Sequence, residues 1–91
     1  MYAILDIEAT GGKVGEESVI EIAVYKYDGK EIVDQFISLV NPERKIDYYV
    51  QKLTHITDKM VRTAPKFHEI AKRIVEITDD CILVGHNVMF D

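Results

Sequence analysis

The sequence predicts a mixed α/β fold, in which two almost wholly apolar strands are separated along the chain by a hairpin and an amphipathic helix. Residues 1–6 and 81–85 are short, almost continuous apolar runs, and such runs are typical of central strands that are buried on both faces. Residues 18–27 and 31–40 are rich in β-branched and aromatic residues, as strands are. Asp28-Gly29 lies between them and is a strong signal for a two-residue hairpin. A length of 91 residues fits one small domain of this kind.

The segment that begins at Pro65 has the pattern of an amphipathic helix. Proline suits the first helical position, because its missing N–H costs nothing there. Apolar residues then recur at helical spacing on one face: Phe67, Ile70, Ala71, Ile74 and Ile77. Glu69 and Arg73 are expected to form an i, i+4 pair on the outer face, and Asp79-Asp80 is expected to end the helix.

The remaining segments predict turns and two short helices. Gly11, followed by two further glycines, marks a flexible turn. Asn41-Pro42 ends the second hairpin strand, because proline cannot donate a ladder hydrogen bond. Three residues have the spacing of one short helical turn: Tyr49, Val50 and Leu53. Thr57 is placed to cap a brief helix over residues 58–62.

A helix between two buried strands predicts a crossover connection, which places the last strand parallel to the first. The expected sheet is therefore a three-stranded antiparallel meander plus a parallel strand, with residues 1–6 and 81–85 in its centre. Ligands of such sheets bind beyond the carboxyl ends of the parallel strands. One of these ends leads to Asp6, Ile7 and Glu8, and the other leads to residues 86–91.

The charge balance disfavours a simple basic surface for nucleic acid. The net charge is −5, with ten acids and five bases in residues 1–50, whereas a protein that binds phosphates by counterion release alone should be basic. Carboxylates that hold divalent cations would reverse the local sign. The single cysteine, Cys81, is expected to be a small core residue, and it allows no internal disulfide. Without a signal peptide or an apolar run of roughly 20 residues, we expect a cytoplasmic protein with no membrane partner.

Three carboxylates are candidates for one site. If the first strand persists through Glu8, its period of two places Asp6 and Glu8 on one face, and Asp91 follows the last strand. Clustered carboxylates repel unless they are neutralised, and Mg²⁺ or Mn²⁺ takes such oxygen ligands. Two such ions can activate a water and stabilise a leaving oxygen in phosphodiester cleavage. The alternative is that these acids are solvated turn residues.

Other polar residues near these strands have two possible roles. Glu21 lies within an apolar run, where it faces either solvent or the metal cleft. Asn87 can cap a helix that begins at Val88, and His86 can satisfy a nearby carbonyl, although both could instead belong to a metal site.

Five segments, taken together and in order, resemble the DnaQ-like (DEDD) 3′→5′ exonucleases, a family that includes the proofreading epsilon subunit of bacterial DNA polymerase III. The segments are spread over essentially the whole chain: Asp6-Ile7-Glu8-Ala9-Thr10-Gly11, Val19-Ile20-Glu21-Ile22-Ala23, Leu39-Val40-Asn41-Pro42, Thr54-His55-Ile56-Thr57 with Met60 and Ala64-Pro65-Lys66-Phe67, and His86-Asn87-Val88-Met89-Phe90-Asp91. The resemblance implies a ribonuclease-H-like fold and two-metal removal of nucleotides from a DNA 3′ end, with Mg²⁺ or Mn²⁺.

The resemblance also implies roles for individual residues. Asp6 would bridge both metals, Glu8 would bind the metal on the nucleophile side, and Asp91 would reach the other. The residues implied at the substrate are Ala9, Thr10 and Gly11 at the terminal nucleotide, Glu21 near the 3′ end, Phe90 in the packing of the second motif, and Asn87 in its turn.

Three departures from the family pattern bear on function. Ala9 replaces a common Thr, and His55 replaces a common Gly at a position that histidine tolerates if φ is positive. The family's third motif, H-x4-D or Y-x3-D, is absent. Residues 1–91 are therefore expected to be the N-terminal portion of a single exonuclease domain, with negligible activity alone.

The missing part also affects packing and partners. Ile82 and Val84 are expected to have an exposed face, which favours self-association. The expected partners are a single-stranded DNA 3′ end and a DNA polymerase catalytic subunit. The alternatives are an RNA-directed, oligoribonuclease-like 3′→5′ exonuclease and a non-catalytic module that binds a polymerase or a strand end.

Overall fold

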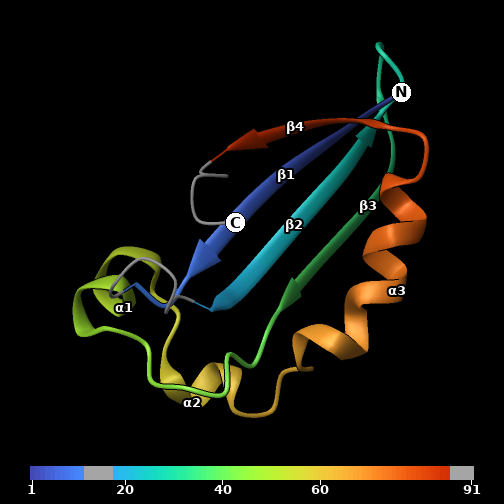
Figure 1. The fold of residues 1–91 in the computed structure, drawn as a ribbon. Coiled ribbons are helices and arrows are strands. Elements are labelled where there is room, and N and C mark those ends of the chain that lie inside the picture. The colour runs from blue at the N-terminus through green and yellow to red at the C-terminus, as the bar shows by residue number, and fades with distance from the viewer. Residues whose placement is uncertain (12–17, 87–91) are drawn as a thin grey trace.

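A computed structural model describes residues 1–11 and 18–86 and shows a four-stranded sheet of order β3-β2-β1-β4 (Figure 1). The strands are β1 (Tyr2–Ala9), β2 (Val19–Tyr27), β3 (Ile32–Leu39) and β4 (Ile82–His86). β1–β2 and β2–β3 are antiparallel, whereas β4 lies parallel to β1. The expected meander with one added parallel strand is confirmed.

The helix α3 (Phe67–Thr78) covers one face of this sheet. Its buried residues Ile70 and Ile77 pack with Ala3 of β1 and Val24 of β2 in the main hydrophobic core. Phe67, which the helical pattern placed on the buried face, is 45% exposed, because it lies at the first turn and beyond the centre of this contact. Because Ile70 and Ile77 pack on the face of β1 that carries Ala3, α3 leaves the opposite face of β1 uncovered.

The N-terminus of α3 differs from the prediction at Pro65. The helix begins after Lys66, whose backbone N–H donates to the Glu69 carboxylate at 2.8 Å. This capping interaction satisfies a donor that the helix itself cannot. Pro65 therefore precedes the cap, and its predicted first helical position is wrong.

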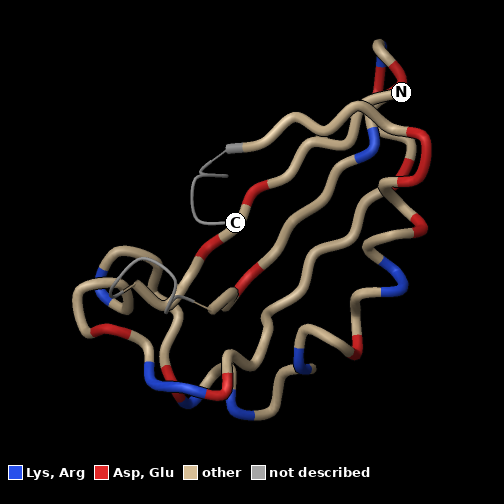
Figure 2. The backbone as a smooth tube through the Cα atoms, viewed as in Figure 1, with Lys and Arg blue, Asp and Glu red and all other residues tan. Residues whose placement is uncertain are grey.

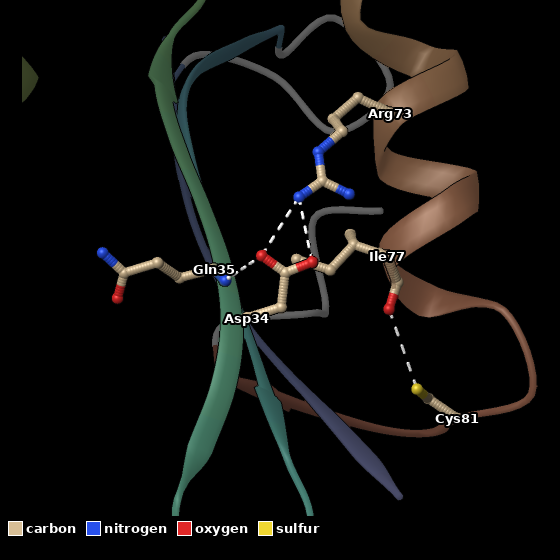
Figure 3. A network of polar contacts seen from close by, with 5 residues as sticks. All are labelled: Asp34, Gln35, Arg73, Ile77 and Cys81. Atoms are coloured by element: carbon tan, nitrogen blue, oxygen red, sulfur yellow. Dashed lines mark hydrogen bonds and ion pairs between the residues drawn. The ribbon is translucent and has the colours of Figure 1, made fainter.

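The predicted pair of Glu69 and Arg73 is also replaced by another contact. Arg73 reaches across to Asp34 of β3, with Nη2 at 3.1 and 3.0 Å from the two carboxylate oxygens (Figure 3). The Arg73 guanidinium, followed by the backbone N–H of Gln35, holds the pKa of Asp34 below its ordinary value. This contact links α3 to β3. Cys81 packs against the same core, as expected, with its Sγ 3.7 Å from the Ile77 carbonyl oxygen.

The hairpin between β2 and β3 is longer than two residues. Tyr27 pairs with Ile32, so residues 28–31 form the loop. The Asp28 carboxylate accepts hydrogen bonds from Lys30 N–H at 2.8 Å and from Glu31 N–H at 2.9 Å. These N–H groups, Glu31 first, lower the pKa of Asp28. The two-residue prediction is wrong, because the Asp28 side chain closes a wider turn.

A second, smaller core lies beneath two short helices, α1 (Tyr48–Thr54) and α2 (Asp58–Val61). Its buried residues are Ile20, Ile46, Val50, Ile56 and Val61. Thr57 caps α2 as predicted, since its side chain accepts from Met60 N–H at 3.3 Å. His55 has φ 63°, which confirms a left-handed position there.

The spacing of Tyr49, Val50 and Leu53 predicted the helix α1, but it does not identify which of its residues are buried. Only Val50 of this helix is buried, whereas Tyr49 is 58% exposed and Leu53 is 75% exposed. A single short helix contacts its neighbours over one residue row, so helical spacing alone does not fix the buried set.

β4 lies at the edge of the sheet among the described residues, and not in its centre as predicted. Ile82 and Val84 are 63% and 45% exposed, so the expected exposed face is confirmed. None of the helices in residues 1–11 and 18–86 is long and apolar enough to cross a membrane.

Candidate functional site

Two carboxylates share the face of β1 that α3 leaves uncovered. Ala3 and Ile7 of β1 are buried in the core beneath α3, so the alternation of a strand directs Asp6 and Glu8 to the opposite face. β1 continues to Ala9, which meets the condition for this arrangement. The carboxyl end of β1 thus presents two acids on one surface.

Glu21 of β2 joins these acids on the same face. It lies directly opposite Glu8 in the antiparallel register, while Asp6 is opposite Ala23. Residues in such positions have Cβ atoms about 5 Å apart. Glu21 is half-buried, and it therefore faces the carboxylate surface rather than only bulk solvent.

The chemistry of this donor set suits a hard divalent cation. Carboxylate oxygens are the ligands that Mg²⁺ and Mn²⁺ prefer. Within residues 1–11 and 18–86, no three His, Cys, Asp or Glu side chains have the geometry of a metal site. The described acids fit such an ion in type, and a complete ligand set needs at least one further group.

The described chain ends beside Asp6. The parallel register pairs Asp6 with His86, the last residue of β4. The remaining predicted site residues, Asn87, Phe90 and Asp91, lie outside the described residues, as does the predicted helix from Val88. Parallel pairing therefore places His86, the last described residue, beside Asp6 near the carboxyl end of β1.

Thr10 has a structural position at the end of β1. It is 1% exposed, and its hydroxyl accepts from Ser18 N–H at 3.1 Å and donates to the Gly11 carbonyl at 3.2 Å. Its backbone N–H donates to the Ser18 carbonyl at 2.8 Å, and its carbonyl accepts from Asp47 N–H at 3.0 Å. Through these hydrogen bonds Thr10 connects the end of β1 to the residues that precede β2 and α1. Its contact with a nucleotide stays a prediction.

Gly11 allows α1 to approach the end of β1. Its φ is 81°, and a Cβ placed there would lie 2.8 Å from Val50 Cγ2 and 2.9 Å from the Tyr49 hydroxyl oxygen. Tyr49 and Asp47 of this contact lie beside Gly11 at the end of β1, but they were not among the predicted site residues. The position of Asp47 immediately before the helical spacing was the available signal, because Asp is a frequent residue before a helix.

Comparison with known proteins identifies the family. The family model RNase_T, described as Exonuclease, matches residues 3–91. The 3′-5′ exonuclease DinG of Staphylococcus saprophyticus is 37% identical over 90 residues, which are 99% of this chain and 10% of DinG. The PolC-type DNA polymerase III of Latilactobacillus sakei is 40% identical over 90 residues, which are 99% of this chain and 6% of that protein.

A solved structure supports the same assignment. Exonuclease X in complex with 5′ overhanging duplex DNA has a TM-score of 0.82 at 27% identity, covering 100% of this chain and 51% of that chain. The ribonuclease-H-like exonuclease fold that the resemblance implied is confirmed. The chain spans a tenth or less of the two curated relatives and about half of exonuclease X. With its family model matched over residues 3–91, this chain belongs to the RNase_T exonuclease family.

Proposed function

We propose that the protein containing this chain is a metal-dependent 3′→5′ exonuclease that removes nucleotides from a DNA 3′ end. The observation that carries the proposal is the position of Asp6 and Glu8 on one open face at the carboxyl end of β1, where the end of β4 pairs with Asp6. The name of one relative, PolC-type DNA polymerase III, and the duplex DNA in the complex of exonuclease X favour DNA as the substrate.

The proposed roles of the acidic residues are in metal binding. Asp6, Glu8 and Asp91 would supply the carboxylate oxygens that hold two Mg²⁺ or Mn²⁺ ions, which, when bound, supply an activated water and stabilise the leaving oxygen. Glu21 would add negative charge opposite Glu8 and so favour cation binding over an empty site.

The end of β1 would position the strand. Ala9, Thr10 and Gly11 would lie against the terminal nucleotide, with Thr10 acting through the backbone that its buried hydroxyl fixes. Asn87 and Phe90 would hold the second motif. The predicted cytoplasmic location and the polymerase catalytic subunit as a partner belong to the same proposal.

The chain itself is proposed to be the N-terminal portion of one exonuclease domain. The match to exonuclease X, which covers all of this chain but only 51% of that chain, supports this. We expect residues 1–91 alone to have negligible exonuclease activity and to self-associate. Sedimentation of the purified chain as a monomer at high concentration would contradict the second expectation.

The test uses the full-length protein with 5′-labelled single-stranded DNA and RNA of the same sequence, in Mg²⁺ and in Mn²⁺. We expect a ladder that shortens by single nucleotides on DNA, and a loss of at least about a thousandfold in kcat/KM for Asp6→Ala and Glu8→Ala. Glu31→Ala removes the same charge from the exposed hairpin and should retain activity.

The outcomes separate the alternatives. Faster degradation of RNA than DNA would favour the RNA-directed, oligoribonuclease-like enzyme. Binding of either strand without metal-dependent cleavage would favour the non-catalytic module. Activity that survives Asp6→Ala would mean that the carboxylate of Asp6 on β1 is not needed for the reaction.

A further inference from the structure

The positive charge of this acidic chain is concentrated in one segment. Residues 44–66 contain six Lys and Arg and two Asp, a net charge of +4, whereas the rest of the chain has five Lys and Arg and fourteen Asp and Glu, a net charge of −9. All six of these basic residues are exposed. Figure 2 shows several blue segments, with a few red ones among them, in and beside α1 and α2, below the red residues at the centre of the sheet. The segregation creates a local positive surface that the net charge of the chain conceals.

Three of these cations surround a shallow hollow of about 380 Å³, here called the basic hollow. Arg44 and Lys45 come from the loop after β3, and Arg62 follows α2. None of the three forms an ion pair with another described residue. Their charges therefore remain available to an anion from outside.

The acids at the basic hollow are already engaged within the fold. Glu43 pairs with Lys66 at 3.1 Å. The Asp58 carboxylate accepts from Ile46 N–H at 2.9 Å and from the Gln51 side-chain amide at 3.2 Å. The Lys66 cation offsets the charge of Glu43, whereas Asp58 keeps one negative charge. With Arg44, Lys45 and Arg62, the hollow therefore retains a net positive charge.

The basic hollow lies at the same end of the sheet as the carboxylates. Across the strands, Glu8 is opposite Glu21, and Glu21 is opposite Leu39 at the end of β3. Two strand spacings separate β1 from β3, about 10 Å, and Asn41, two residues after Leu39, already lines the hollow. A strand whose end lies at Glu8 needs only a few nucleotides to reach it.

We propose that the basic hollow binds the phosphodiester backbone of the DNA strand, a few nucleotides from the 3′ end held at Asp6 and Glu8. This inference rests on the proposed exonuclease function. Phosphate oxygens match the paired N–H donors of arginine, and the local charge would offset the repulsion between the strand and the acidic remainder of the chain. The hollow therefore supplies the basic surface that the overall composition lacks.

The test measures equilibrium binding of a labelled single-stranded DNA 12-mer to the full-length protein in EDTA, so that no cleavage occurs, at several salt concentrations. The variant is Arg44→Gln with Lys45→Gln and Arg62→Gln. We expect affinity to fall at least tenfold at low salt, and the slope of log K against log salt to fall by about two units, since each phosphate contact on a single strand contributes roughly 0.7.

The matched control is Lys26→Gln with Lys30→Gln and Lys72→Gln, which changes the net charge equally outside residues 44–66. It should leave both affinity and slope near the wild-type values. Equal losses in the two triple variants would overturn the proposal, because the effect would then follow total charge. The single variants Arg44→Gln and Arg62→Gln, each expected to lower the slope by roughly half a unit or more, guard against a misfolded triple variant.

Two further outcomes overturn the inference. Wild-type affinity in the hollow variant would exclude the DNA backbone as the occupant and favour an acidic protein surface instead. A loss that is as large on a dinucleotide as on the 12-mer would place these cations at the terminal nucleotide. Because binding is measured in EDTA, a failure of the exonuclease proposal appears separately, as absent cleavage in the metal-containing assay.

Discussion

Glu8 of β1 and Glu21 of β2 lie directly opposite each other on the open face of the sheet, in the register that also pairs Asp6 with Ala23. Like charges in opposed positions of an antiparallel pair are destabilising. A cation bound between the two carboxylates would relieve this repulsion.

Replacing Glu21→Gln should therefore stabilise the metal-free chain by up to about 1 kcal/mol. In millimolar Mg²⁺ the gain should shrink, because the cation already relieves the repulsion in the wild type. Urea unfolding with and without Mg²⁺ measures both values. Glu31→Gln, in the exposed hairpin, is the control for loss of a single charge. A gain that is identical in both conditions would argue against cation binding at this face.

Gly11→Ala should destabilise the chain by about 3 kcal/mol or more, because the added Cβ meets both strain and a clash. The φ of 81° disfavours a Cβ, and Val50 Cγ2 lies 2.8 Å away. Gly29→Ala is the matched control, since its φ is 102° but nothing lies within 4 Å, so that only the backbone penalty of roughly 1–2 kcal/mol applies. Thermal unfolding of both variants tests the difference. Equal destabilisation would mean that α1 moves away at no cost.

Thr10→Val should cost about 2 kcal/mol, because it removes the hydroxyl that accepts from the Ser18 N–H within a buried site. Valine preserves the shape, so the loss reports the hydrogen bonds and not a cavity. Thr63→Val, at an exposed position, should change the free energy of unfolding by less than about 0.5 kcal/mol. If the two substitutions proved equally mild, the junction of β1, β2 and α1 would depend on backbone contacts alone.

The stability of the chain should fall in acid partly through Asp34. The Arg73 guanidinium and the Gln35 N–H hold the pKa of Asp34 below 3.8 in the folded state. Such a group stabilises the fold above its unfolded pKa of about 3.9, and that contribution is lost as the pH falls through the lower folded value. The urea midpoint should therefore drop less between pH 5 and pH 2 in Asp34→Asn than in the wild type.

Glu76→Gln provides the comparison for that experiment. Glu76 is exposed on α3 and forms no ion pair among the described residues. It should leave the acid dependence close to that of the wild type, while Arg73→Gln should mimic Asp34→Asn. An Arg73→Gln variant with wild-type acid sensitivity would assign the effect to the Gln35 N–H instead.

The strands were predictable from composition, because β-branched and aromatic runs leave few other ways to bury apolar surface. The parallel placement of β4 followed from a crossover through α3, the amphipathic helix that precedes it. The position of β4 at the edge was not predictable, since a continuous apolar run indicates burial but does not identify the neighbouring strand or helix that covers it. Ile82 and Val84 show this difference.

The prediction of a contact within α3 was wrong where a residue distant in sequence formed the contact instead. The i, i+4 spacing favoured Glu69 for Arg73, but Glu69 caps α3 and Arg73 reaches Asp34 of another element. Surface pairs of this kind differ by small energies, so tertiary geometry decides between them.

For the site, the period of a strand was enough to place Asp6 and Glu8 together. The position of Glu21 required the register between β1 and β2, which includes an irregularity between Glu8 and Ala9. Sequence spacing within one strand carries no information on that offset. The basic hollow has the same origin, because Arg44 and Arg62 meet only after the chain has folded around α1 and α2.

The place of β1 between β2 and β4 also affects how the chain is made. Tyr2 is synthesised 80 residues before its parallel neighbour Ile82. During synthesis β1 can pair with β2 while its other edge still presents unsatisfied backbone donors and acceptors. Among β1, β2 and β3, the strand that carries Asp6 and Glu8 is therefore the last to complete the pairing seen in the described residues. A nascent chain stalled before residue 82 would expose it to wrong partners.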